Sequence, residues 1–199
     1  VYASSSSVYG DHPDLPKVEH KTGNLLSPYA GTKGIDEIYA NIFTKCYNME
    51  CIGLRYFNIF GPRQDPNGAY AAVIPKFINL MREGKQPKIN GDGNFSRDFT
   101  YVTNAVEANF LALTTNNKKS FGEAFNIGAG GRFSILDMFN IIKKEINFEL
   151  DPIFGNERFG DIPHSNADIS KAKNILGYNP KILFNEGIIL TIKYYINKK

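Results

Sequence analysis

SPYAGTK, residues 27–33, has the pattern of a helix start. Ser27 is a typical N-cap residue, and Pro28 fits the first helical position, where its missing N–H needs no partner. Beyond this segment, apolar residues recur at the spacing of one helical face, namely Ile35, Ile38, Tyr39, Ile42 and Phe43. The pattern predicts a helix over residues 27–49.

Tyr29 and Lys33 lie four residues apart, so a helix places their side chains on the same side of its first turn. A cation beside a phenol favours the phenolate, which would let Tyr29 act as a base. The alternative is an exposed tyrosine next to an exposed lysine, with no chemical role.

Apolar segments on both sides of this helix predict a parallel sheet. Residues 1–5 read as the end of a strand and residues 51–60 as a buried strand, and a strand–helix–strand order implies a crossover. The serines at 4–7 and Asn58 then fall at the carboxyl edge, where open α/β sheets bind ligands. The alternative interpretation of the serine run at residues 4–7 is a flexible linker.

The composition is that of a globular protein and indicates neither a nucleic-acid nor a membrane partner. Of the 199 residues, 42% are apolar, the net charge is +3, and acids and bases are interspersed, which argues against nucleic-acid binding. The chain shows no apolar run of bilayer length and no signal peptide, so we expect a cytoplasmic protein with no membrane partner. Cys46 and Cys51 could form a disulfide or a metal pair, but we predict two reduced, buried thiols and no metal.

The second half of the chain alternates helices and short strands. Helices are predicted over residues 71–83, 102–116, 134–147, 168–176 and 184–195, and strands over 87–89 and 124–128. Arginines stand at three junctions with loops, Arg97, Arg132 and Arg158, and guanidinium groups suit an anionic ligand. Surface salt bridges are the alternative for these arginines.

Seven motifs in order carry a family resemblance. They are SSSVYG (5–10), YAGTK (29–33), LRYFNIFGP (54–62), RDF (97–99), NIG (126–128), RFGD (158–161) and ADISKA (167–172). Together they resemble the extended short-chain dehydrogenase/reductase superfamily, and within it the NAD-dependent nucleotide-sugar epimerases. The match extends over essentially the whole chain.

The resemblance implies an α/β fold, the C-terminal part of a Rossmann-type doubly wound parallel sheet with a small α/β substrate-binding domain. Residues 1–62 and 98–130 would belong to the NAD-binding domain, residues 63–97 to a substrate-domain excursion, and residues 131–199 to the nucleotide-sugar domain. The glycine-rich phosphate-binding turn of this fold is not found, and we expect it upstream of Val1. We therefore expect residues 1–199 alone to be inactive.

The resemblance also implies roles for individual residues. Ser5, Tyr29 and Lys33 would be catalytic, and Tyr29, Lys33 and Tyr56 would contact NAD. The substrate would be a UDP-sugar, with Asn58, Arg97 and Arg158 on the diphosphate and Asp161 on the uridine ribose. The uracil pocket would contain Ala72, Val73 and the strand from Lys88 to Asn90. Ser6, Ser7 and Arg132 complete the predicted substrate site.

Ser6 and Ser7 favour one reaction within the superfamily. Related dehydratases carry an Asp-Glu pair at these positions, and related decarboxylases carry a glutamate at the position of Ser7. Because serines lack a carboxylate's basicity for proton transfer at carbon, the pair favours 4-epimerisation. A dehydratase, decarboxylase or reductase of this superfamily and a nucleotide-binding regulatory protein of the same fold remain alternatives.

The loops at 11–19 and 64–75 look like those of bacterial UDP-N-acetylglucosamine 4-epimerases, which act in surface-polysaccharide synthesis. In that resemblance Ser165 replaces a bulky tyrosine of enzymes restricted to non-acetylated sugars. This predicts UDP-GlcNAc/UDP-GalNAc or the uronic acid forms as substrates, with UDP-glucose as the alternative. Family enzymes commonly form homodimers through two long helices, one equivalent to residues 27–49.

Overall fold

A parallel sheet forms the centre of one half of the molecule. The computed structural model describes residues 1–66, 72–157 and 162–197. Strands β1 (Tyr2–Ser5), β2 (Ile52–Tyr56) and β7 (Glu123–Ile127) lie in the order β1-β2-β7. All are parallel, with Ser5 opposite Tyr56 and Tyr56 opposite Ile127. The predicted strand–helix–strand crossover is confirmed, and the carboxyl ends of the three strands share one edge.

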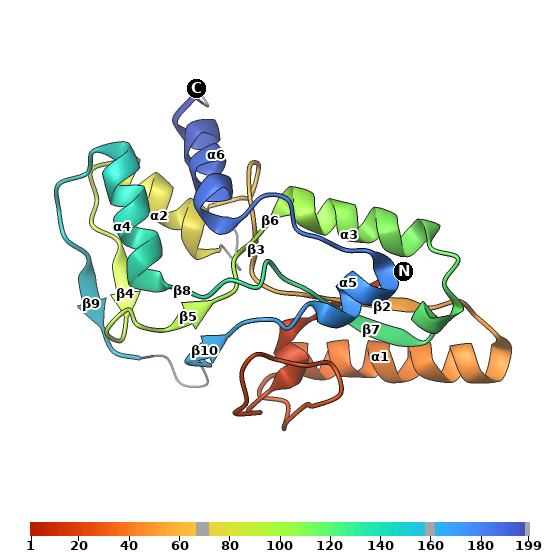
Figure 1. Cartoon of the computed structure of the whole chain (residues 1–199). Coiled ribbons are helices and arrows are strands. Elements are labelled where there is room, and N and C mark those ends of the chain that lie inside the picture. Colours follow the sequence, from red (N-terminus) through yellow and green to blue (C-terminus); the bar gives the residue numbers. More distant parts are fainter. Residues whose placement is uncertain (67–71, 158–161, 198–199) are drawn as a thin grey trace.

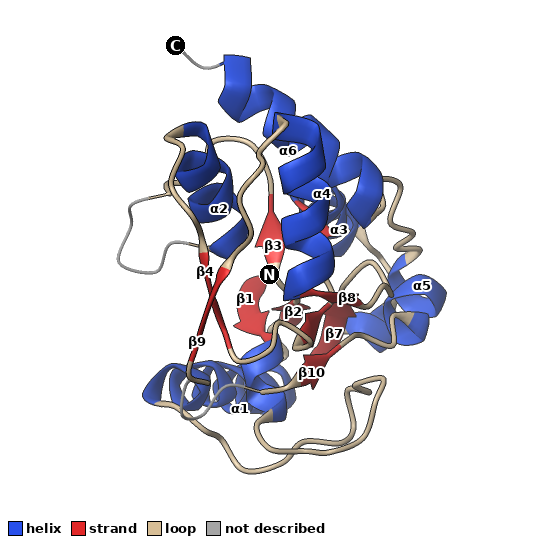
Figure 2. Ribbon diagram, turned by 90° about the vertical axis from the view of Figure 1, so that its left-hand side faces the viewer, coloured by secondary structure: helices blue, strands red, loops and turns tan. Residues whose placement is uncertain are grey.

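Helices cover both faces of this sheet (Figure 1, Figure 2). Helix α1 (Pro28–Tyr47) lies on one face, and α3 (Val102–Thr114) and α5 (Ser170–Leu176) lie on the other. Alternate strand residues pack against α3 and α5 in a hydrophobic cluster with Leu54 and Phe125 at its centre. The start of α1 is as predicted, because Ser27 Oγ accepts a hydrogen bond from Ala30 N at 3.1 Å and Pro28 is the first helical residue.

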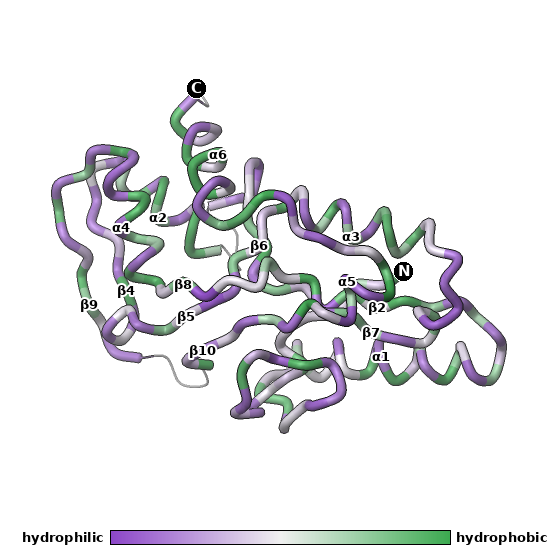
Figure 3. Tube along the Cα trace, in the orientation of Figure 1, coloured by the Kyte–Doolittle hydropathy of each residue, from purple (hydrophilic) through white to green (hydrophobic). Residues whose placement is uncertain are grey.

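The apolar face of α1 points away from the sheet. Ile35, Ile38, Tyr39, Ile42 and Phe43 are all exposed, and Ala30 is the buried residue of this helix. Figure 3 shows hydrophobic positions recurring along α1. The side toward the sheet is polar instead, so the usual arrangement of an amphipathic helix is reversed.

The other half of the molecule has a helical core with short strands at its margin. Helices α2 (Val73–Arg82), α4 (Ile135–Ile146) and α6 (Phe184–Asn197) pack around a cluster that includes Phe77, Phe139 and Ile188. Its strands are β4 (Lys88–Asn90) paired with β9 (Ile153–Gly155), and β5 (Ser96–Arg97) between β8 (Phe133–Ser134) and β10 (His164–Ser165). Helix α4 begins with the capping box of Ser134 and Asp137, at the start of the helix predicted over residues 134–147.

The strand predicted over residues 51–60 is two strands. After β2, Phe57 N donates to Ile127 O, and Asn58 O accepts from Thr100 N. The chain thus leaves the sheet, and β3 (Ile59–Phe60) pairs with β6 (Thr100–Tyr101). Asn58 is a polar residue within an otherwise apolar run. At this change of strand partner its side chain is exposed, at the surface between the two halves of the molecule.

The prediction of two buried thiols is wrong. Both cysteines are free, as predicted, but Cys46 is exposed and Cys51 is partly exposed. Cys46 lies near the end of α1, where most of the helix surface is open. Within residues 1–66, 72–157 and 162–197, no helix is long and apolar enough to cross a membrane.

Candidate active site

The serine segment turns into a short helix at the carboxyl edge of the sheet. Ser5 ends β1 and caps the 3₁₀ helix η1 (Ser6–Tyr9), with its Oγ accepting from Ser7 N at 3.1 Å. The Ser7 Oγ is buried and has no hydrogen-bond partner among the described residues. A buried hydroxyl without a partner is costly, so its position suits a polar group of a ligand. Gly10 ends η1 at φ +53°, and a Cβ there would lie 1.8 Å from Asn24 O.

Tyr29 and Lys33 lie on the first turns of α1, beside β1. The Tyr29 side chain is open to ligands, with the residue 56% exposed. Lys33 Nζ donates to Ala3 O at 2.8 Å and to Asp36 Oδ2 at 3.4 Å. An ammonium group has three N–H donors, so these two contacts leave one donor for a ligand.

A second set of predicted residues lines one cavity of about 300 Å³ between β5, β4 and α2. Asn58, Val73, Lys88, Asn90 and Arg97 all contribute to its wall. Ala72 directly precedes Val73 as the N-cap residue of α2. The structure therefore brings Asn58 and Arg97, predicted for the diphosphate, together with Val73, Lys88 and Asn90, predicted for the uracil, into one concave surface.

Arg97 and Ser165 are partners across the parallel pairing of β5 and β10. Arg97 donates to Ser96 O and Pro163 O, at 2.9 and 3.1 Å. Arg132 donates from Nε to Ser96 Oγ at 2.9 Å, and the same hydroxyl contacts His164 Nδ1. Since adjacent strand residues point to opposite faces, Arg132 approaches the face of β5 opposite to the Arg97 side chain.

A buried carboxylate joins the loops around this region. Asp98 is fully buried and accepts from Ala129 N, Gly130 N and Ala167 N at 2.8, 3.0 and 3.2 Å. Burial raises the pKa of Asp98, against the effect of these hydrogen bonds. Asp98 follows Arg97 and Ala167 lies two residues after Ser165, so this side chain sets the spacing of two predicted site residues.

Tyr56 stands at the end of β2, next to Ser5. Its hydroxyl accepts from Asn109 Nδ2 on α3 at 2.7 Å, and burial raises its pKa. The Tyr56 hydroxyl is therefore engaged by α3. Arg158 and Asp161 lie outside the described residues, and no metal-binding group of histidine, cysteine, aspartate and glutamate is found among those described.

Several residues of the site region were not predicted from the sequence. Lys76, Phe77 and Phe95 line the same cavity as Asn58. The helical spacing from Val73 to Lys76 and Phe77 could have indicated the first two, because they share one face of α2. Phe95 follows a turn and carries no periodic signal.

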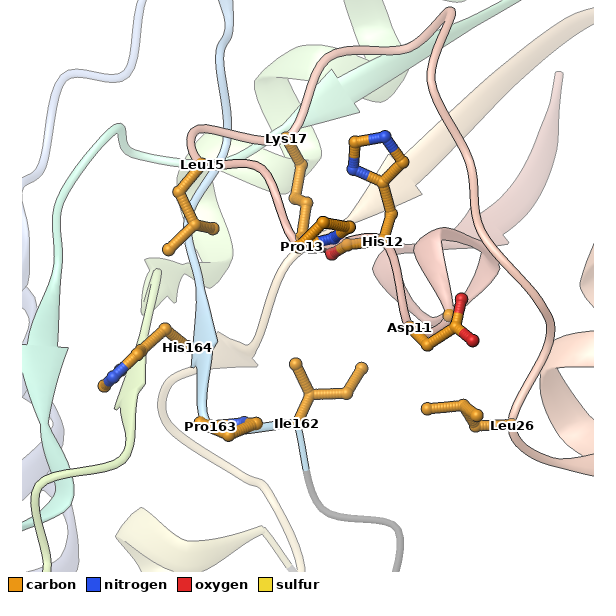
Figure 4. Close-up of a pocket in the computed structure, with 10 residues that line it drawn as sticks. Asp11, His12, Pro13, Leu15, Lys17, Leu26, Ile162, Pro163 and His164 are labelled. Atoms are coloured by element: carbon orange, nitrogen blue, oxygen red, sulfur yellow. Dashed lines mark hydrogen bonds between the residues drawn. The ribbon is translucent and has the colours of Figure 1, made fainter.

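A separate cavity of about 360 Å³ lies between the loop at residues 10–17 and the segment before β10 (Figure 4). Leu15, Leu26 and Ile162 give it apolar walls, and Lys17 points toward it. Lys17 is 3% exposed, its Nζ donates to His12 O, and it has no ion pair among the described residues. Burial lowers the pKa of Lys17, because the interior disfavours the charged ammonium.

The buried ammonium predicts a change of stability with alkaline pH. Because the pKa of Lys17 is lower in the folded protein than the ordinary 10.5, the unfolded state binds more protons between the two values. The charged Lys17 therefore lowers the free energy of unfolding at neutral pH. This free energy rises as pH increases toward the pKa of Lys17 in the unfolded state. Each pKa unit corresponds to about 1.4 kcal/mol.

Lys17→Met removes this dependence. In urea unfolding of the intact protein, the stability of the variant relative to the parent should be highest at neutral pH and should fall as pH rises toward 10.5. Lys21→Met is the control, because the Lys21 side chain is 48% exposed. Parallel stability curves for the Lys17 variant and the parent would refute the assignment.

Comparison with known proteins places these features in a family context. Residues 1–128 match the model of the NAD dependent epimerase/dehydratase family. A putative UDP-glucose 4-epimerase of Methanocaldococcus jannaschii is 40% identical over 198 residues, which are 99% of this chain and 63% of that protein. The chain thus spans less than two thirds of this relative's length.

Solved structures of similar proteins agree with the fold. A UDP-N-acetylglucosamine 4-epimerase from Methanobrevibacter ruminantium M1, in complex with UDP-N-acetylmuramic acid, superposes with a TM-score of 0.91 at 40% identity, covering 98% of this chain and 62% of that one. A UDP-glucuronic acid 4-epimerase from Bacillus cereus, in complex with UDP-glucuronic acid and NAD, gives a TM-score of 0.87 at 33% identity, covering 96% of this chain and 59% of that one.

Proposed function

The chain belongs to the NAD dependent epimerase/dehydratase family, and from this premise we propose that the intact protein catalyses NAD-dependent 4-epimerisation of a UDP-sugar. One observation carries the proposal: serines, rather than carboxylates, follow Ser5 where β1 ends beside Tyr29 and Lys33. Epimerisation at C4 needs a proton moved at oxygen, whereas elimination or decarboxylation chemistry would use a carboxylate here.

The residues present fit the nicotinamide–ribose end of NAD. Lys33 retains one donor for a ribose hydroxyl, and the Tyr29 side chain is open at the edge where β1 ends. When bound, NAD supplies the redox chemistry by accepting a hydride from C4 of the sugar and returning it. No residue of the chain is assigned to the adenine end.

In this mechanism Tyr29 takes the proton of the C4 hydroxyl and later returns it to the same oxygen. Ser5 Oγ hydrogen-bonds that oxygen and the Tyr29 phenol, and the Lys33 ammonium stabilises the phenolate. Asn58 and Arg97 hold the diphosphate, so that the sugar can present its other face while it remains tethered. The cavity lined by Val73, Lys88 and Asn90 would hold the uracil.

UDP-GlcNAc and UDP-GalNAc are the substrates that we propose, with their uronic acids as further members of the class. The support is Ser165, a small side chain directly across from Arg97 in the β10–β5 pair. A small residue beside the diphosphate-binding arginine leaves room for a substituent at C2 of the sugar. Synthesis of a surface polysaccharide is the process in which such a product would be used.

Product analysis tests the proposed reaction. The intact protein is incubated with UDP-GlcNAc and NAD, and the sugar is identified by NMR. We expect UDP-GalNAc to accumulate until the two epimers reach equilibrium. A stable keto sugar would indicate a dehydratase. A pentose formed in a parallel incubation with the corresponding UDP-uronic acid, whose C6 carboxylate can leave as CO₂, would indicate a decarboxylase. Either result would refute 4-epimerisation.

We further propose that the intact protein is a homodimer through α1. The support is its outward apolar face, on which Ile35, Ile38, Tyr39 and Ile42 are each at least 47% exposed. A two-fold axis would bring this face against its own copy and bury both apolar surfaces. Such continuous exposure is unusual in a monomer.

Ile38→Glu is expected to convert the dimer to a monomer, because it places a charge in the centre of that face. Light scattering coupled to size-exclusion chromatography measures the mass. Leu183→Glu is the control, since Leu183 is 57% exposed away from α1. A parent protein that is already monomeric, or an Ile38 variant that stays dimeric, would contradict this interface.

A further inference from the structure

We propose that the ion pair of Glu37 and Arg55, whose side chains are 17% and 7% exposed, positions Tyr29 and Lys33 relative to Ser5. This inference rests on the proposed function, because it concerns the same catalytic residues. Neither Glu37 nor Arg55 touches the candidate substrate cavity, so both would act through the residues beside them. They are positioning residues rather than catalytic ones.

The need for such a device follows from how α1 meets the sheet. A helix on an α/β sheet is usually held by an apolar stripe, but here the apolar stripe faces outward and Ala30 is the buried residue. Apolar packing therefore does little to fix how far α1 slides or rotates on β1. Directional polar contacts must set that register.

Two side chains of α1 bind consecutive residues of β1. Lys33 Nζ donates to Ala3 O at 2.8 Å, and Glu37 Oε1 accepts from Ser4 Oγ. Lys33 and Glu37 are one helical turn apart, and Ala3 and Ser4 immediately precede Ser5 in the strand. The two contacts thus hold the start of α1, with Tyr29, at a defined position along the strand that ends in Ser5.

Arg55 anchors the same carboxylate to the neighbouring strand. Its Nε and Nη2 donate to Glu37 Oε1 and Oε2 at 2.8 and 2.7 Å, which is a two-point contact with little freedom to rotate. Arg55 is 6% exposed, its Nη1 donates to Glu19 O at 3.0 Å, and its guanidinium lies 4.9 Å from the centre of the Tyr9 ring. Arg55 directly precedes Tyr56, the residue at the end of β2 that is predicted to contact NAD. The ion pair therefore also fixes the strand that carries Tyr56.

Stability alone is a weak reason for this arrangement. A buried ion pair can often be replaced by apolar side chains of similar volume without loss of stability, because desolvation offsets most of the attraction. What an apolar pair lacks is direction, since it tolerates sliding of the helix. The positioning role therefore predicts that activity and stability will separate when the pair is replaced.

The test compares Glu37→Gln with the double variant Glu37→Met/Arg55→Met in the intact protein. We expect Glu37→Gln to lower the melting temperature, because Arg55 is left buried with a neutral partner, and to lower kcat at least tenfold. The double variant should recover the melting temperature but keep the low kcat, with KM for the UDP-sugar nearly unchanged. Glu107→Gln is the control, because its pair with Lys181 is exposed.

Hydrogen exchange gives a readout that does not need turnover. Backbone amides of residues 27–33 should exchange faster in the double variant than in the parent, while those of α3 should not change. A double variant that recovers kcat together with the melting temperature, or that leaves exchange of residues 27–33 unchanged, would overturn the positioning role. An inactive parent with faster exchange in the double variant would instead refute the proposed function and leave the register role supported.

Discussion

Tyr29→Phe is expected to lower kcat for UDP-sugar epimerisation by about 10²–10⁴-fold, because the variant keeps the ring but has no hydroxyl to take the C4 proton. The residue is 56% exposed, so the substitution should leave the melting temperature unchanged. Affinity for the UDP-sugar should also be preserved, because the proposed diphosphate contacts lie on Asn58 and Arg97. The measurement is a coupled assay for kcat and KM, with calorimetry for binding.

Tyr39→Phe is a matched control, since Tyr39 is on the same helix and is 59% exposed. This substitution also removes a phenol hydroxyl, but from the outward face of α1. The Tyr39 variant should therefore keep full activity. Unchanged kcat in the Tyr29 variant would remove this residue from the mechanism. Loss of activity in both variants would point to the helix rather than to the phenol.

Ser165→Tyr is expected to lower kcat/KM for UDP-GlcNAc and UDP-GalNAc by about 100-fold or more. The value for UDP-glucose should be nearly unchanged. The phenol ring would fill the space beside Arg97 that we assign to the N-acetyl group, whereas a C2 hydroxyl needs no such space. The ratio of kcat/KM for the two substrate pairs measures the effect.

Ser165→Ala is the control, because it keeps the space and removes only the hydroxyl. It should leave the ratio close to that of the parent. Equal loss on UDP-glucose and UDP-GlcNAc in the tyrosine variant would contradict the pocket assignment and would indicate general damage to β10.

Local rules predicted much of this fold because they depend on neighbours in sequence. The N-cap at Ser27 and the helix boundaries at residues 134 and 176 follow from such rules, and the structure has a capping box at Ser134 and a left-handed Gly177 there. The parallel sheet also followed, since two strands separated by a long helix need a crossover.

Predictions that depended on the surroundings of a residue were less successful. Periodicity showed that the apolar residues of α1 share a face, but it did not show that this face is turned away from the sheet. The burial of Cys46 was wrong for the same reason, because burial depends on what packs against a helix. The change of strand partner at Asn58 depends on Thr100, which is distant in sequence.

The candidate site shows the same division. The family resemblance grouped Asn58, Val73, Lys88, Asn90 and Arg97 as substrate-binding residues, and they line one cavity. The Glu37–Arg55 contact was not predicted, because its partners come from a helix and a strand that are distant in sequence. Neither residue belongs to the predicted site. Arg132 has the residue type expected of a diphosphate ligand, yet its observed partner is Ser96.

The central claim is that the protein moves a proton only at oxygen while the sugar is transiently oxidised at C4. Epimerisation of UDP-GlcNAc by the intact protein in D₂O, followed by NMR of the product, tests it most directly. We expect UDP-GalNAc with no deuterium at any ring carbon, because Tyr29 exchanges only the hydroxyl proton and Ser6 and Ser7 cannot act at carbon. Deuterium at C5 of the product would contradict it.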